Sequence, residues 1–209
     1  MDAADGNSLA AIGFLTALRD STHGWFGGYL VLSHLGRPLE FHCTTPIEPT
    51  RVQQILYGPT LQPYLLGDVI GHTLVRRAEL PVQAILTDLP EMLSLSLLRP
   101  EVVACVDEKL IPAAGIALAK ATTPDQRPVG ERAGAVPGQT DDPQPHLEIG
   151  TVQLYGTSTC SWEPARLRQQ LAPLVDHVEL LEPFRRIREA ILEAQRISVD
   201  PSAEASAAA

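Results

Sequence analysis

Two short apolar runs near the middle of the chain constrain its fold more than any other feature. Residues 82–88 (VQAILTD) and 101–108 (EVVACVDE) are almost continuously apolar, and PEMLSLSLL between them has the length of a short helix. Such runs are typical of strands that are buried on both faces of a sheet covered by helices. The order strand, helix, strand predicts a right-handed parallel crossover. We therefore expect a sheet that contains at least one parallel pair.

The N-terminal part of the chain predicts antiparallel strands. Residues 9–18 (LAAIGFLTAL) contain a glycine and precede a loop-like DSTHGWFGG stretch, which favours a strand over a short helix. Residues 29–33 and 38–43 are apolar runs on either side of a short link with Gly36, the pattern of a β-hairpin. The glycines of HGWFGGY precede a strand and not a helix, so we expect a tight turn into this hairpin.

Along the sequence, helices are predicted both before and after the central strands. Residues 48–80 indicate a short helix, a break at Tyr57-Gly58-Pro59 and a longer helix that ends near Arg77. After a strand at 151–155, helices are expected at 163–175 and 180–197. The last helix is amphipathic, with one apolar stripe made of Leu180, Phe184, Ile187 and Ile191.

Together these elements predict an α/β (or α+β) fold, with a mixed sheet, an N-terminal β-hairpin, one parallel strand–helix–strand unit and covering helices. Residues 9–121 form the α/β core, and residues 148–197 add a strand and two helices that pack on the same core. A separate small subdomain for 148–197 is the alternative. Residues 122–147, with five prolines and three glycines, are expected to form a flexible linker or insertion. Residues 198–209 are expected to be a disordered tail.

Charge and cysteine content limit the classes of function. The 209-residue chain has a formal net charge of −9, which argues against nucleic acid and against an anionic membrane as partners. Its three cysteines are odd in number and far apart, which excludes a disulfide framework or zinc finger and suits a reducing cytoplasm. No apolar run of about 20 residues could span a bilayer, so we expect a soluble, cytoplasmic protein. Motifs for dinucleotide, phosphate-loop and zinc-protease sites are absent, so no cofactor is expected.

The stretch EFHCTTP at residues 40–46 places a histidine beside a cysteine. On a strand, neighbouring side chains point to opposite faces, so Phe41 and Cys43 share one face while Glu40 and His42 share the other. His42 therefore cannot activate Cys43, because activation of a nucleophile needs hydrogen-bond reach. We expect Cys43 to be a small core residue, and His42 to meet a substrate, a metal ion or water.

A second constellation consists of Asp68, His72 and Arg76, whose spacing of four puts them on one helix face. Asp68 and His72 could share a metal ion, or the carboxylate could orient the imidazole for acid–base catalysis. The alternative is a solvated ladder of ion pairs. A third ligand could come from His42, whose strand precedes this helix. His42, Asp68 and His72 thus form a candidate catalytic or metal site.

Acidic residues follow the two apolar runs. If those strands are parallel, Asp88, Asp107 and Glu108 gather at the carboxyl edge of the sheet, where open α/β sheets bind ligands. Asp88-Leu-Pro-Glu91 also has the pattern of a capping box. We therefore expect Asp88 to cap the next helix, and Asp107 with Glu108 to be the more open pair.

Cys160 lies between a strand and the start of a helix, where the pKa of a thiol is lowered. The surrounding LYGTSTCSW resembles the active-site turn of glutaredoxins, in which a strand, a T-x-T-C-P-W-C turn and a helix follow one another. The resemblance covers residues 151–171 and departs at Ser161, which replaces the proline, and at Glu163, which replaces the second cysteine. It implies thiol–disulfide chemistry at Cys160, and the alternative is an unreactive thiol in a turn.

Three classes of function are consistent with the sequence. We favour a non-enzymatic binding or accessory module that acts through contacts with a protein partner or a second copy of the chain, because no catalytic motif is complete and the last helix is strongly amphipathic. The second class is a metal-assisted or hydrolytic enzyme that uses His42, Asp68 and His72. The third is a thiol redox protein centred on Cys160.

Overall fold

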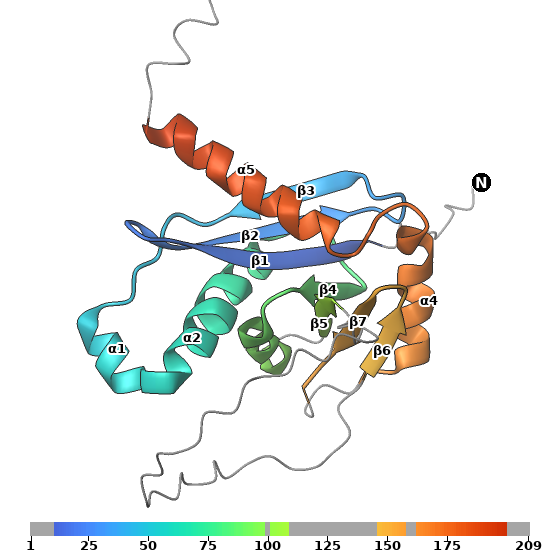
Figure 1. Cartoon of the computed structure of the whole chain (residues 1–209), viewed down its shortest axis with the longest axis horizontal. Coiled ribbons are helices and arrows are strands. Elements are labelled where there is room, and N and C mark those ends of the chain that lie inside the picture. Colours follow the sequence, from blue (N-terminus) through green and yellow to red (C-terminus); the bar gives the residue numbers. More distant parts are fainter. Residues whose placement is uncertain (1–10, 99–100, 109–145, 158–161, 200–209) are drawn as a thin grey trace, which may run out of the picture.

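A computed structural model describes residues 11–98, 101–108, 146–157 and 162–199, the last four without their side chains. These residues form one mixed, seven-stranded sheet in the order β3-β2-β1-β4-β5-β7-β6 (Figure 1). Its strands are β1 (Ile12–Asp20), β2 (Gly24–Leu32), β3 (Pro38–Cys43), β4 (Ala84–Thr87), β5 (Val102–Glu108), β6 (His146–Ile149) and β7 (Val152–Tyr155).

The pairing of these strands confirms the predicted fold class. β1 pairs with β4, and β4 with β5, in parallel, so the apolar runs form the expected parallel unit. β1 with β2, and β2 with β3, are antiparallel, which confirms the predicted hairpin. β7 adds to β5 in antiparallel orientation and β6 closes that edge. Residues 148–157 thus extend the same sheet.

Helices cover both faces of the sheet. On one side of the sheet, the exposed helix α1 (Arg51–Tyr57) is followed without a break by η1 (Gly58–Thr60), α2 (Leu61–Pro63), the π-helical η2 (Tyr64–Gly71) and α3 (His72–Arg77). Of these, η2 and α3 cover this face of the sheet, together with the 3₁₀-helical η3 (Pro90–Leu97). The other face is covered by α4 (Pro164–Val175) and α5 (Glu182–Val199), the latter crossing β1 to β3 in Figure 1. None of the described helices has both the length and the apolarity needed to cross a membrane.

The predicted stripe of α5 packs against the sheet as expected. Leu180, which lies just before α5, is buried in one core cluster with Phe184, Ile187 and Ile191 of the helix and with apolar residues of β1, β2, β4, β5 and β7. Phe184 contacts Phe14 edge to face, with ring centroids 5.5 Å apart. A second cluster fills the opposite face, between the strands and η2, α3 and η3.

Two adjacent glycines in β2 allow helices to approach the sheet closely from both sides. A Cβ at Gly27 would lie 2.1 Å from Cγ2 of Ile70 in η2, and one at Gly28 would lie 2.3 Å from Cγ2 of Ile187 in α5. The expectation that these glycines form a turn was therefore wrong, since both lie inside a strand, as glycines do where another chain segment comes close. Of the three glycines in HGWFGGY, Gly24 alone has a positive φ, +89°, which is typical of a turn.

Several other expectations fall partly or wholly on residues without description. Most of the predicted 122–147 linker and nearly all of the 198–209 tail lie outside the described residues. At the end of the predicted linker, His146 and Leu147 belong to β6, and Leu147 is buried in the core.

Adding one methyl group at Gly28 tests how closely α5 packs on β2. We expect Gly28→Ala to lower the free energy of unfolding by about 1–3 kcal/mol, because the new Cβ overlaps Ile187. Ile187→Ala alone should cost about 2–5 kcal/mol by leaving a cavity. The double variant should cost clearly less than the sum, because removal of Cγ2 accommodates the new Cβ. Denaturant unfolding of all four proteins measures this coupling, and additive costs would contradict the close approach.

Candidate functional site

His42 lies on β3 and pairs with its neighbour Glu40 across one face of the strand. The Nε2 of His42 is 2.6 Å from Oε1 of Glu40, and the Glu40 carboxylate also accepts hydrogen bonds from the backbone N–H groups of Glu79 and Leu80 at 2.9 and 3.1 Å. Burial raises the pKa of Glu40, but these hydrogen bonds outweigh it and the pKa is lowered overall. The pair therefore ties the end of α3 to β3.

Asp68 and His72 are not joined with His42 in a metal site. Asp68 accepts a hydrogen bond from the Ser94 hydroxyl at 3.3 Å, in the interface between η2 and η3. His72 begins α3 and lines a shallow pocket with Thr73 and Arg76. Among the residues described, no group of three His, Cys, Asp or Glu side chains could hold a metal ion.

Asp88 makes a hydrogen-bonded cluster with Thr16 and Arg188. Its carboxylate accepts a hydrogen bond from the Thr16 hydroxyl at 2.6 Å and forms an ion pair with Arg188, which also donates to Thr16 Oγ1 at 3.1 Å. η3 follows Leu89 and has no side-chain cap, so the expected capping role of Asp88 was wrong. The reason is strand alternation: Asp88 shares its face with Leu86, which packs on the α5 side, whereas η3 covers the other face.

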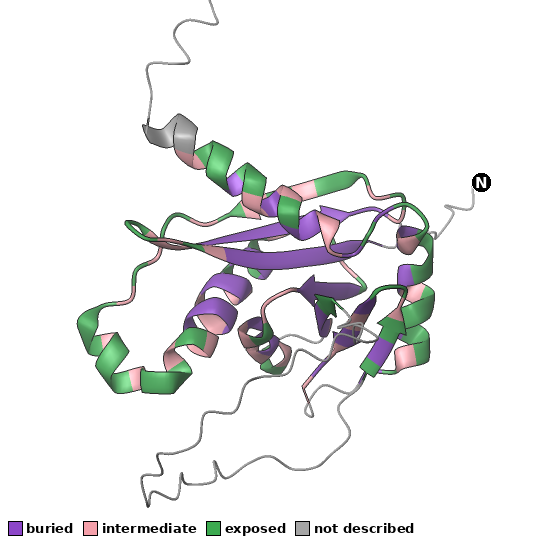
Figure 2. Cartoon of the chain, viewed as in Figure 1, coloured by how far each residue is buried: buried purple, intermediate pink, exposed green. Residues whose placement is uncertain are grey.

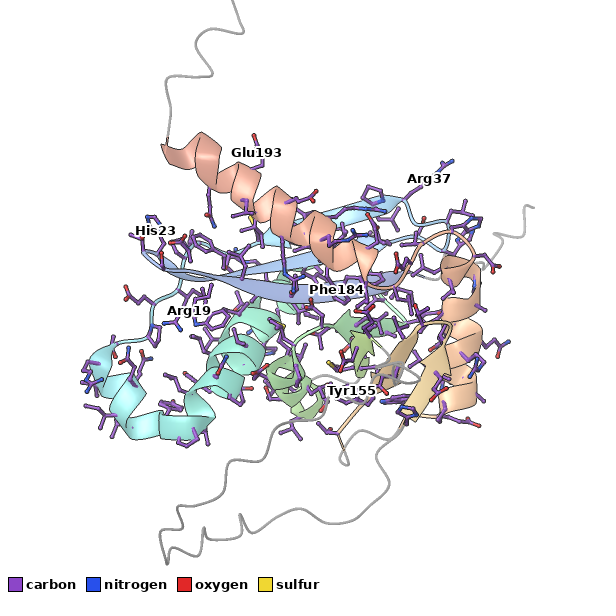
Figure 3. All side chains as sticks on the ribbon, in the orientation of Figure 1. Arg19, His23, Arg37, Tyr155, Phe184 and Glu193 are labelled. Carbon is purple, nitrogen blue, oxygen red and sulfur yellow. The ribbon has the colours of Figure 1, made fainter. Side chains whose placement is uncertain are left out.

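The acids at the end of β5 have other hydrogen-bond partners than Asp88. Asp107 and Glu108 are exposed at the end of β5, where Asp107 accepts a hydrogen bond from the Glu108 backbone at 2.8 Å. Near them, burial raises the pKa of the Cys105 thiol to about 11, although a hydrogen bond with Tyr155 opposes the shift. Tyr155 is labelled in Figure 3. The Cys105 thiol is therefore protonated at neutral pH, which makes it a poor nucleophile.

The other two cysteines are Cys43 and Cys160. Cys160, with its glutaredoxin-like turn, lies outside the described residues. Cys43 is exposed, so the expectation of a core residue was wrong. It lies on an edge strand whose outer side chains, including Phe41, are incompletely covered by α5. The strand alternation that separates Cys43 from His42 is as expected, because His42 pairs opposite the buried Tyr29 and Cys43 opposite Gly28.

Cys43 lines a cavity of about 400 Å³ between the β1–β2 hairpin end and the C-terminal half of α5. The end of the EFHCTTP stretch, residues 43–46, forms one wall. Asp20 and His23 contribute from the hairpin, with Nδ1 of His23 2.9 Å from Oδ1 of Asp20. Figure 3 shows His23 at the hairpin tip, and Glu193 on the side of α5 that faces away from the sheet.

A second unusual feature is the apolar surface of α1. This helix buries none of its residues, and Val52, Ile55 and Leu56 are 63%, 66% and 75% exposed. Figure 2 shows the helix as mostly exposed, projecting from the sheet. Their spacing of three and four residues puts the three side chains on one face. That spacing is visible in the sequence, but only the fold shows that nothing within the described residues covers them.

Comparisons with known proteins add little. No protein-family model matches the chain. No curated protein matches it either. A solved structure with partial similarity is endonuclease V of Ciona intestinalis in complex with a 23mer DNA that contains an inosine followed by a ribo-adenosine. The sequence identity is 15%, the TM-score is 0.34, and the match covers 49% of this chain and 47% of that one, about half of its length.

This comparison contradicts the expectation that nucleic acid is excluded as a partner, because the similar structure is a DNA complex. The exclusion rested on the net charge of −9, which is a sum over the chain and does not describe any one surface. The exclusion of nucleic acid is therefore withdrawn, and no nucleic-acid role follows for this chain.

Arg188 can be tested against a neighbour on the same helix. We expect Arg188→Met to lower the free energy of unfolding by about 1–3 kcal/mol, since it leaves the largely buried Asp88 carboxylate without its cation. Arg185→Met, at an exposed position of α5, should change it by less than about 0.5 kcal/mol. Equal effects of the two variants in denaturant titrations would show that the Asp88 cluster adds nothing to stability.

The Glu40 pair predicts a defined pH dependence. Because the pKa of Glu40 is lowered in the folded protein from an ordinary value of 4.5, its contribution is present above pH 4.5 and is lost as pH falls through the folded pKa. We expect Glu40→Gln to be less stable than the wild type at pH 7, and the difference to shrink below pH 4.5. Denaturant unfolding between pH 7 and 3 measures this, with Glu48→Gln as the exposed control. A difference that is constant across this range would contradict the assignment.

Proposed function

We propose that this chain is a non-enzymatic binding module that acts through a protein contact made by α1. The observation that carries the proposal is the exposed stripe of Val52, Ile55 and Leu56 on a helix that buries none of its residues. Single exposed apolar residues are common on protein surfaces, but a grouped set on one helix face is typical of an interaction site. An amphipathic helix with this spacing is one of the recurrent ways in which proteins fill an apolar groove on a partner.

The local structure supports this role because it forms the helix before any partner binds. Thr50 accepts a hydrogen bond from the Gln53 backbone at 3.2 Å, and the Gln53 side chain accepts one from the Thr50 backbone at 2.9 Å. This capping box satisfies backbone groups at the start of the helix. A preformed helix loses less conformational entropy on binding than a flexible segment does.

The position of α1 is also fixed at both ends. Before the helix, Ile47 and Trp25 exchange two backbone hydrogen bonds of 2.8 Å. At its last residue, the ring of Tyr57 stacks on that of Tyr64 with centroids 4.4 Å apart. α1 therefore projects from the sheet in a defined direction. Its only charged residue is Arg51, so we infer that the partner offers a mainly apolar groove.

The metal-assisted and redox alternatives gain no comparable support. His42 and Asp68 already have hydrogen-bond partners within the chain, Glu40 and Ser94. Cys160 lies outside the described residues. We therefore propose no second function.

Site-specific photocrosslinking in the native host tests the proposed contact. A benzophenone amino acid at position 55 should give an adduct of one defined mass with another protein, whereas the same group at position 54 should not. Gln54 is the control because it lies on the opposite face of α1. The identified partner, once purified, should bind the Ile55→Glu variant at least about tenfold more weakly than the Gln54→Glu variant.

Three outcomes would contradict the proposal. They are adducts of equal yield from both positions, adducts with lipid alone, and equal affinities of the two glutamate variants. An adduct of twice the chain mass would assign the stripe to self-association instead. Both glutamate variants should keep the wild-type unfolding midpoint, since neither residue is buried.

A further inference from the structure

The cavity beside Cys43 has the size and the wall chemistry of a small-molecule site. Its volume of about 400 Å³ falls within the range of roughly 300–1,000 Å³ that such sites occupy. Phe26 of β2, Pro46 and the α5 residues Ile191 and Ala194 provide apolar walls. Sites of this kind combine mainly apolar walls with a few polar groups that orient the ligand.

Gln195 also lines the cavity, but its Nε2 atom is buried, so a ligand oxygen cannot reach this donor from the cavity. The apolar side chains of the wall therefore provide most of the contact with a ligand.

The charge of the wall indicates the charge of the ligand. Asp20 lines the same cavity, and backbone hydrogen bonds from Thr22 and His23 lower the pKa of its carboxyl group. The carboxylate is thus charged at neutral pH, and it already has His23 as a partner at 2.9 Å. A second carboxylate in the cavity would be repelled. These facts favour an uncharged ligand.

We propose that the cavity binds a small, uncharged, mainly apolar molecule. This site is separate from the stripe on α1 and does not depend on the function proposed for that helix. Cys43 is an exposed thiol on the cavity wall, so its accessibility reports whether the cavity is filled.

A neutral fluorescent ketone, 6-propionyl-2-dimethylaminonaphthalene, is a suitable probe for the full chain. We expect saturable 1:1 binding with a blue shift of its emission, because the probe enters an apolar environment. Saturating probe should slow the alkylation of Cys43 by N-ethylmaleimide at least about tenfold, followed by mass spectrometry of the Cys43 peptide. Cys105 is buried in the core and serves as the unreactive internal reference.

One pair of variants locates the probe. Ala194→Trp fills the cavity from α5 and should abolish binding, whereas Leu192→Trp, on an exposed position of the same helix that does not line the cavity, should not.

The proposal is overturned if binding is not saturable, if Ala194→Trp binds as well as Leu192→Trp, or if the probe does not protect Cys43. It is also overturned if binding appears only after residues 200–209 are removed, because the cavity would then belong to the chain's own C-terminal segment.

Discussion

The close approach of two helices to β2 is the constraint on which most of the structure depends. Gly27 faces Ile70 of η2 and Gly28 faces Ile187 and Ile191 of α5, so one dipeptide accommodates packing on both faces of the sheet. Any side chain at either position would force a helix outward and open the core beneath it.

Polar contacts then orient α5 along the sheet. Phe184 and Ile187 bury its first turns, and Arg188 reaches the Asp88 carboxylate and the Thr16 hydroxyl at the carboxyl end of β4. Burial alone would tolerate some rotation of the helix, whereas hydrogen bonds between ionised groups have preferred geometry. Beyond Ile191 the helix runs past the hairpin end, and the cavity beside Cys43 lies in the space between them.

Periodicity and composition were sufficient to predict the mixed sheet, its parallel unit and the buried stripe of α5, because these depend on patterns local in sequence. The errors have one physical source, which is contact between residues far apart in the chain. Asp88 was expected to cap η3, yet its partners Thr16 and Arg188 are 72 and 100 residues away. Gly27 and Gly28 resembled turn residues because the helices that occupy their missing side-chain space are not adjacent in sequence. Cys43 was expected in the core because apolar alternation does not reveal that a strand lies at an edge.

The segment that connects β3 to α1, residues 44–50, takes part in both proposed sites. Residues 44–46 form a wall of the cavity, and Ile47, three residues before Thr50, is fixed to Trp25 by backbone hydrogen bonds. A ligand in the cavity therefore contacts the segment that leads into α1. If it shifts the orientation of α1, thermodynamic linkage requires the partner on α1 to change the ligand's affinity by the same factor. If the Trp25–Ile47 pairing keeps this segment rigid, the two sites are independent, because a ligand that does not distinguish between two states of α1 cannot shift their balance.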